Sequence, residues 1–112
     1  HADVNKVIKA TDIVKNKCKD LVVDGEFQLD AAVIEGIGRR KAPGSELAGQ
    51  ANVLVFPDLD AGNICYKATE RFAKAIAVGP IMQGLNKPCN DLSRGCSIDD
   101  IYLMIAISSV SA

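Results

Sequence analysis

Apolar residues recur along this chain at helical spacing in four segments. In the first segment, which ends near Cys18, apolar side chains repeat every three or four residues and lysines occupy the other face. The same spacing returns over residues 30–40, over residues 60–77 and from residue 98 onward. The pattern therefore predicts four helices. The first is already under way where the sequence starts, which is typical of a piece of a longer protein.

Three short segments between these helices predict β-strands. Residues 21–25 are an apolar run closed by a glycine, residues 52–56 are an apolar run followed by Pro57, and residues 77–82 form a third extended piece. The loop over residues 41–45 contains a proline and a glycine, which favour a turn. Strands that alternate with helices are typical of an α/β fold, so we expect a mainly parallel sheet covered by helices.

Length and charge limit the classes of function. At 112 residues, the chain is one domain or part of a larger one, and it is long enough to bury a core. Its 13 basic and 14 acidic residues are scattered, which argues against nucleic acid as a main partner. The longest apolar run is too short to cross a bilayer, and no signal peptide is recognisable. We therefore expect a soluble, cytoplasmic protein with no membrane partner.

The cysteines indicate neither a metal site nor a disulfide framework. The four cysteines form no C-x-x-C pair, and the terminal His1 is the only histidine. We interpret Cys18 and Cys65 as small packing residues in a reducing compartment.

The segment from Asn90 to Ser97 carries the strongest chemical signal. It places Ser93 and Arg94 where a loop enters the last helix, and Asp99 and Asp100 follow within one turn. A helix N-terminus offers unpaired backbone N–H groups and the positive end of the helix dipole. Arginine adds a planar, permanently charged fork that suits phosphate. The segment therefore predicts an oxyanion site beside a carboxylate.

The same residues also have ordinary structural interpretations. Ser97 and Asp100 have the spacing of a capping box, in which the acid only satisfies a backbone N–H and becomes a weaker base. Arg94 alone would be a surface arginine. Cys96 could be a nucleophile that forms an acyl-enzyme, but no histidine is available to activate it.

Polar residues follow each of the three predicted strands. The carboxyl ends of parallel strands meet at one edge of a sheet, where ligands collect, so we expect these loops to share one site. After the second and third strands, the residues that we expect to bind substrate are Asn63, Tyr66, Lys67, Gln83 and Asn90. The loop after the first strand adds Asp24, Glu26, Gln28 and Asp30. Packing on the helix surface is the alternative role for Tyr66 and Lys67.

Several motifs resemble the phosphate acetyltransferase family and occur in the order of that family. They are Val23-Asp24-Gly25-Glu26-Phe27-Gln28-Leu29-Asp30-Ala31-Ala32, Lys41-Ala42-Pro43-Gly44-Ser45, Ala51 to Leu59 with Ala61-Gly62-Asn63-Ile64 and Tyr66-Lys67, and the tail Gly79-Pro80, Gln83-Gly84, Lys87-Pro88 and Asn90 to Gly95. The resemblance implies that residues 1–112 are the C-terminal catalytic portion of a phosphate acetyl/butyryltransferase-type domain whose N-terminal part is absent. It also implies part of an isocitrate/isopropylmalate dehydrogenase-like fold.

The activity implied by the resemblance is reversible acetyl transfer between coenzyme A and inorganic phosphate through a ternary complex. Coenzyme A and acetyl phosphate are then substrates, and no bound cofactor or metal is implied. The family's catalytic serine, arginine and aspartate fall on Ser93, Arg94 and Asp100. We interpret Asp100 as the general base, Arg94 as the clamp for phosphate and oxyanion, and Ser93 as a polarising hydrogen-bond partner. Without the rest of the cleft, the isolated chain is expected to have little or no activity.

Two other functions remain as alternatives. A phosphate butyryltransferase shares much of the motif set and differs in acyl length. A noncatalytic CoA-sensing or oligomerisation module, such as the related tail of some malic enzymes, belongs to a different class. The apolar last helix, Tyr102 to Val110, suits a homodimer contact as well as a core.

Overall fold

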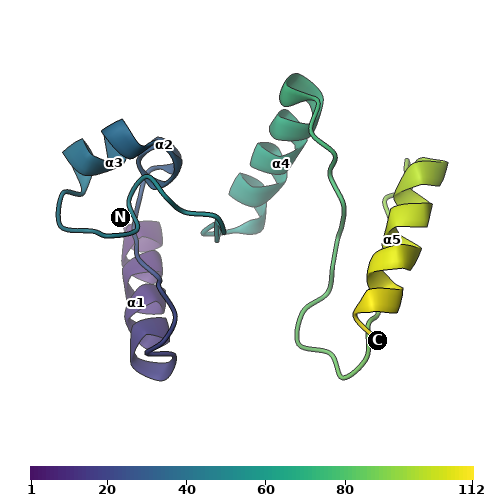
Figure 1. Cartoon of the computed structure of the whole chain (residues 1–112), viewed down its shortest axis with the longest axis horizontal. Helices are drawn as coiled ribbons and strands as arrows, with labels where there is room; N and C mark the ends of the chain where they lie inside the picture. The colour runs from purple at the N-terminus through teal and green to yellow at the C-terminus, as the bar shows by residue number, and fades with distance from the viewer. The chain divides into compact units, whose positions relative to one another are not determined.

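Five helices and no strand make up the protein. The computed structural model describes all 112 residues. The helices are α1 (Ala2–Lys17), α2 (Leu29–Val33), α3 (Glu35–Lys41), α4 (Leu59–Ala73) and α5 (Ile98–Val110), and irregular segments join them (Figure 1). The chain divides into two compact units, His1–Gly62 and Asn63–Ala112, and the division falls in the first turn of α4.

The predicted helices are present, with two changes that have local causes. The segment predicted over residues 30–40 is divided into α2 and α3 by Ile34, whose backbone is extended at φ −116° and ψ 111°. The helix predicted over residues 60–77 ends at Ala73, where Lys74 adopts a left-handed conformation with φ 54°. Both boundaries depend on backbone angles that apolar spacing does not specify.

The predicted parallel sheet is absent, so the α/β fold class expected from the sequence is wrong for this chain. Residues 21–25, 52–56 and 77–82 are connecting segments, and no ladder of backbone hydrogen bonds joins any two of them. Val53 and Val55 leave 75% and 90% of their surface exposed. An apolar run indicates that a segment suits burial, but a strand forms only where a neighbouring backbone pairs with it. Within these 112 residues no segment supplies that neighbour, and the sheet of an isocitrate/isopropylmalate dehydrogenase-like fold is not seen.

The first unit is built around small residues. Helices α2 and α3 pack against each other. The buried apolar side chains of this unit are those of Ala31, Ala32 and Ala48. Gly38 of α3 approaches the loop after α3 so closely that a Cβ there would lie 2.6 Å from the carbonyl carbon of Ala48. A glycine at this position is therefore needed for α3 to pack.

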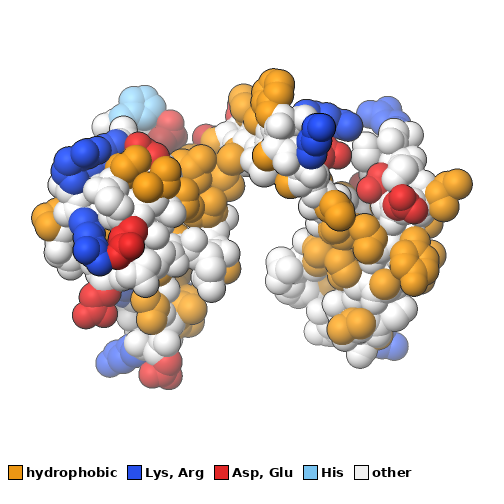
Figure 2. Space-filling model, turned by 45° about the horizontal axis from the view of Figure 1, so that its top comes forward, with side chains coloured by type: hydrophobic (Ala, Val, Ile, Leu, Met, Phe, Trp, Pro, Cys, Tyr) orange, Lys and Arg blue, Asp and Glu red, His pale blue; other side chains and the backbone are white.

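The second unit contains most of α4 and all of α5, and it buries few side chains. Met104 of α5 is its one buried apolar residue. No residue of α4 is buried, and Phe72 remains 88% exposed. Figure 2 shows hydrophobic side chains gathered on the visible surface of the molecule. None of the five helices is both long enough and apolar enough to cross a membrane.

Candidate active site

Ser93 and Arg94 belong to a tight turn that precedes α5. The backbone N–H of Cys96 donates to the carbonyl oxygen of Ser93 at 3.0 Å, and the backbone N–H of Gly95 donates to Ser93 Oγ at 3.4 Å. Arg94 lies at the tip of this turn, is exposed, and forms no ion pair with a carboxylate. Its guanidinium therefore has N–H donors available for an anion.

Asp100 closes the first turn of α5 together with Ser97. The Asp100 atom Oδ2 accepts hydrogen bonds from the backbone N–H of Ser97 at 2.7 Å and from its hydroxyl at 2.9 Å. The backbone N–H of Asp100 donates in return to Ser97 Oγ at 3.2 Å. The capping box suggested by the spacing is thus confirmed. The second carboxylate oxygen, Oδ1, accepts no hydrogen bond.

These contacts hold the pKa of Asp100 below its ordinary value. The main cause is the hydrogen bond from the Ser97 backbone N–H, and the Ser97 hydroxyl is the second. Slight burial opposes the shift, and the positive charge of Arg71 in α4 adds a further lowering. Asp100 is therefore ionised at neutral pH and is a weaker base than an ordinary aspartate.

Ser97→Ala is expected to raise the pKa of Asp100 toward the ordinary aspartate value of about 3.9. The substitution removes the hydroxyl donor and keeps the backbone N–H donor, so only part of the shift is lost. An NMR titration of the Asp100 carboxyl carbon measures the change. Ser109→Ala, which removes a hydroxyl from the other end of α5, is the matched control. An unchanged Asp100 pKa in Ser97→Ala would contradict the expectation.

The sign of the associated pH dependence follows from the direction of this shift. The pKa of Asp100 is lower in the folded state than in the unfolded state. The stabilisation from the capping box is therefore complete above the unfolded pKa, and it is lost as the pH falls through the folded pKa.

Three of the predicted substrate-binding residues share one face of α4. Asn63, Tyr66 and Lys67 have the spacing of three and four residues that places side chains side by side on a helix. Lys67 Nζ lies 5.1 Å from the centre of the Tyr66 ring, in a cation–π contact. All three side chains are exposed, so this face is open to a ligand. Substrate binding by these residues stays a prediction.

Asn90 has an internal role that the sequence did not indicate. Its Oδ1 accepts a hydrogen bond from the backbone N–H of Met82 at 3.0 Å, and its Nδ2 donates to Ser108 Oγ at 2.9 Å. Gln83, which follows Met82, is exposed. Sequence reasoning missed Ser108. No sequence signal marks this contact, because Ser108 lies 18 residues from Asn90 along the chain.

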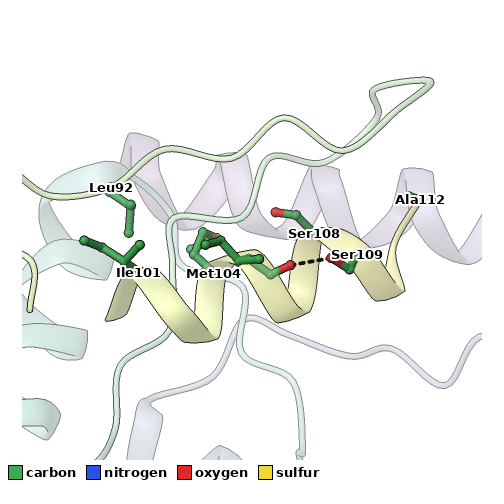
Figure 3. A pocket seen from close by; sticks show the side chains of 7 residues that line it. Leu92, Ile101, Met104, Ser108, Ser109 and Ala112 are labelled. Carbon is green, nitrogen blue, oxygen red and sulfur yellow. Dashed lines mark hydrogen bonds between the residues drawn. The ribbon is translucent and has the colours of Figure 1, made fainter. Parts of the chain in front are cut away.

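Two open hollows lie in the second unit, and neither includes Ser93 or Arg94. One, of about 480 Å³, is lined by Asp100 and by further polar side chains from the end of α4 and the start of α5. Those side chains belong to Glu70, Ser97, Asp99 and Tyr102. The other hollow, of about 360 Å³, is mainly apolar and lies along α5 (Figure 3). No hydrogen bond or ion pair joins Ser93, Arg94 and Asp100 to one another.

The acidic residues after the first predicted strand belong to the first unit, where Asp24 and Asp30 pair with lysines. Asp24 accepts from Lys15 at 2.8 Å, and Asp30 lies 3.2 Å from Lys41, which also donates to Gln28. Because no sheet forms, the shared sheet edge on which this part of the predicted site rested does not exist in the chain. The structure also contains no cluster of side chains that could hold a metal ion.

Comparison with known proteins identifies the family. The phosphate acetyltransferase of Acetivibrio thermocellus is 60% identical over 107 residues, which are 96% of this chain and 32% of that protein. The phosphate acetyltransferase of Acinetobacter baylyi is 56% identical over 111 residues, which are 99% of this chain and 15% of that protein. The chain thus spans about 15 to 32% of the length of these relatives.

A solved structure gives the same result. The EutD phosphotransacetylase from Staphylococcus aureus is 48% identical and superimposes with a TM-score of 0.87 over 100% of this chain and 36% of its own. Residues 1–109 match the sequence pattern that defines the phosphate acetyl/butaryl transferase family. The resemblance found in the motifs is therefore confirmed, and the chain belongs to the phosphate acetyl/butaryl transferase family.

Proposed function

We propose that this chain forms part of the active site of an enzyme that catalyses acetyl-CoA + phosphate = acetyl phosphate + CoA. Membership of the family supports the reaction, as do relatives named phosphate acetyltransferase at 50 to 60% identity. The observation that carries the proposal is the exposed, unpaired guanidinium of Arg94 at the tip of the turn before α5. In this proposal residues 1–112 are the C-terminal catalytic portion, and other parts of the enzyme complete the cleft.

Arg94 and Ser93 act on the charge that develops during acetyl transfer. In the direction from acetyl phosphate, the sulfur of coenzyme A attacks the carbonyl carbon. The bond from that carbon to the bridging phosphate oxygen breaks, and phosphate leaves with the electron pair. Negative charge builds on the carbonyl oxygen and on the departing phosphate. The guanidinium fork and the serine hydroxyl are donors suited to these oxygens.

Asp100 takes the proton of the thiol in this mechanism. An ordinary thiol has a pKa of about 8.5 and an ordinary aspartate about 3.9, so this transfer is uphill. The lowered pKa of Asp100 makes this proton transfer still more unfavourable. Stabilisation of the thiolate by the charge of Arg94 reduces the difference. The capping box supports a defined orientation of the base, because Oδ2 is held by Ser97 while Oδ1 is free to accept the proton.

Coenzyme A is a substrate in this proposal, and no further cofactor or metal takes part. The exposed face of α4 that carries Asn63, Tyr66 and Lys67 supports contact with the substrates.

All four cysteines are free, which supports a reducing, cytoplasmic setting. Apolar residues of α5 leave much of their surface exposed, 72% for Tyr102 and 62% for Ile105. This exposed apolar surface supports a homodimer contact through α5.

Acetyl phosphate is expected to give a kcat/KM at least about tenfold higher than butyryl phosphate, because a pocket fitted to a short acyl chain has no room for two more methylenes. The measurement follows thioester formation with CoA by the full-length natural polypeptide that carries this sequence. Faster turnover of butyryl phosphate would identify a phosphate butyryltransferase. Binding of CoA without turnover of either substrate would indicate a CoA-sensing module.

A further inference from the structure

We propose that Asn90 and Ser108 form a positioning pair that fixes the Ser93–Arg94 turn against α5; this inference rests on the function proposed above. The Asn90 side chain joins three parts of the second unit. Its Oδ1 accepts a hydrogen bond from the backbone N–H of Met82 at 3.0 Å. Its Nδ2 donates to Oγ of Ser108, which lies 18 residues further along the chain, at 2.9 Å. Both side chains of the pair are half-buried, which limits competition from water.

The other serines at the end of α5 show that the contact made by Ser108 is specific. Ser109 donates its hydroxyl to the carbonyl oxygen of Ile105, and Ser111 donates to that of Ile107, each at 2.9 Å. These hydroxyls bond within their own helix, as Figure 3 shows for Ser109. Ser108 is the serine of this group whose hydrogen-bond partner lies outside α5. It therefore links the helix to the segment that leads into the turn.

The turn itself makes no hydrogen bond to the rest of the unit, and Leu92 at its start lines the apolar hollow along α5. The hydrogen bonds of residues 91–96 stay within the segment. Asp91 Oδ1 accepts from the backbone N–H of Leu92. Ser93 accepts from the backbone N–H of Gly95 through Oγ and from that of Cys96 through its carbonyl oxygen. Two polar anchors enclose this segment. Asn90 bonds to α5 on one side of it, and Ser97 begins α5 through the capping box on the other.

Loss of one anchor would free the turn at one end. Arg94 makes no ion pair of its own that could hold the guanidinium in place. Its position relative to α5 therefore depends on the backbone of the turn. A displacement of about 1 Å in such a group is enough to cost about 100-fold in rate. Asn90 and Ser108 thus act through Arg94 and are positioning residues.

The test uses the full-length natural polypeptide that carries this sequence, with Ser108→Ala, Asn90→Ala and the double variant. We expect kcat for acetyl phosphate and CoA to fall about tenfold in Ser108→Ala and up to about 100-fold in Asn90→Ala. We also expect an almost unchanged KM for CoA. The double variant should lose no more than Asn90→Ala alone, because both substitutions break the same link. Ser109→Ala is the matched control, and Ser108→Thr, which keeps a hydroxyl, should restore most of the activity.

A second measurement separates this inference from the proposed function. Amide hydrogen exchange over residues 91–96 should become faster in Ser108→Ala and stay unchanged in Ser109→Ala, whether or not the wild type transfers acetyl groups. A wild type without transferase activity but with this change in exchange would refute the proposed function and leave the pair intact as a structural anchor. An active wild type with unchanged exchange and unchanged kcat in Ser108→Ala would overturn the pair. Because Ser108→Ala removes one partly exposed hydroxyl, it provides the test even if Asn90→Ala fails to fold.

Discussion

Arg94→Ala is expected to lower kcat/KM for acetyl transfer by about 100- to 1,000-fold in the full-length polypeptide, the usual effect of removing one donor that stabilises developing negative charge. The guanidinium lies exposed at the tip of the turn before α5 and has no carboxylate partner. Its removal should therefore leave the free energy of unfolding within about 0.5 kcal/mol of wild type. Thioester formation from acetyl phosphate and CoA measures the first effect, and urea unfolding the second.

Two further variants make this result specific. Arg94→Lys keeps the charge and loses the planar fork, so it should recover only part of the activity. Arg39→Ala is the matched control, since Arg39 is also exposed but pairs with Glu35 within α3. Wild-type turnover in Arg94→Ala, or an equal loss in Arg39→Ala, would show that Arg94 does not clamp the phosphate.

The 112-residue chain in isolation is expected to turn over acetyl phosphate more than about 1,000-fold more slowly than the full-length polypeptide, because several positioning groups are lost at once. Its own packing is sparse. The buried apolar side chains are three alanines and Met104, and among the helices only α2 and α3 are in contact. So little apolar burial does not offset the conformational entropy of ordering the chain.

The same argument predicts how the isolated chain unfolds. Val55 is 90% exposed and Phe72 is 88% exposed, so both leave apolar surface in water. We expect broad, weakly cooperative thermal unfolding by circular dichroism and binding of a hydrophobic dye. The full-length polypeptide, purified in the same way, should show a sharp transition. A sharp transition of the 112-residue chain, together with turnover close to that of the full polypeptide, would contradict this prediction.

The sequence by itself determined the features whose causes are local. The spacing of apolar residues located α1, α4 and α5, because a helix satisfies its backbone hydrogen bonds within one segment. The capping box of Ser97 and Asp100 was readable for the same reason, since its partners are three residues apart. The family was readable from motifs that stand in order along the chain, and comparison confirmed it.

Only the tertiary structure decided the features that depend on distant partners. The apolar run around Val53 has the composition of a strand, but no neighbouring backbone pairs with it in this chain. Asn90 meets Ser108 across 18 residues, a contact that no local pattern specifies. Strand pairing and long-range hydrogen bonds require two segments to meet in space, and spacing along the chain does not determine whether they do.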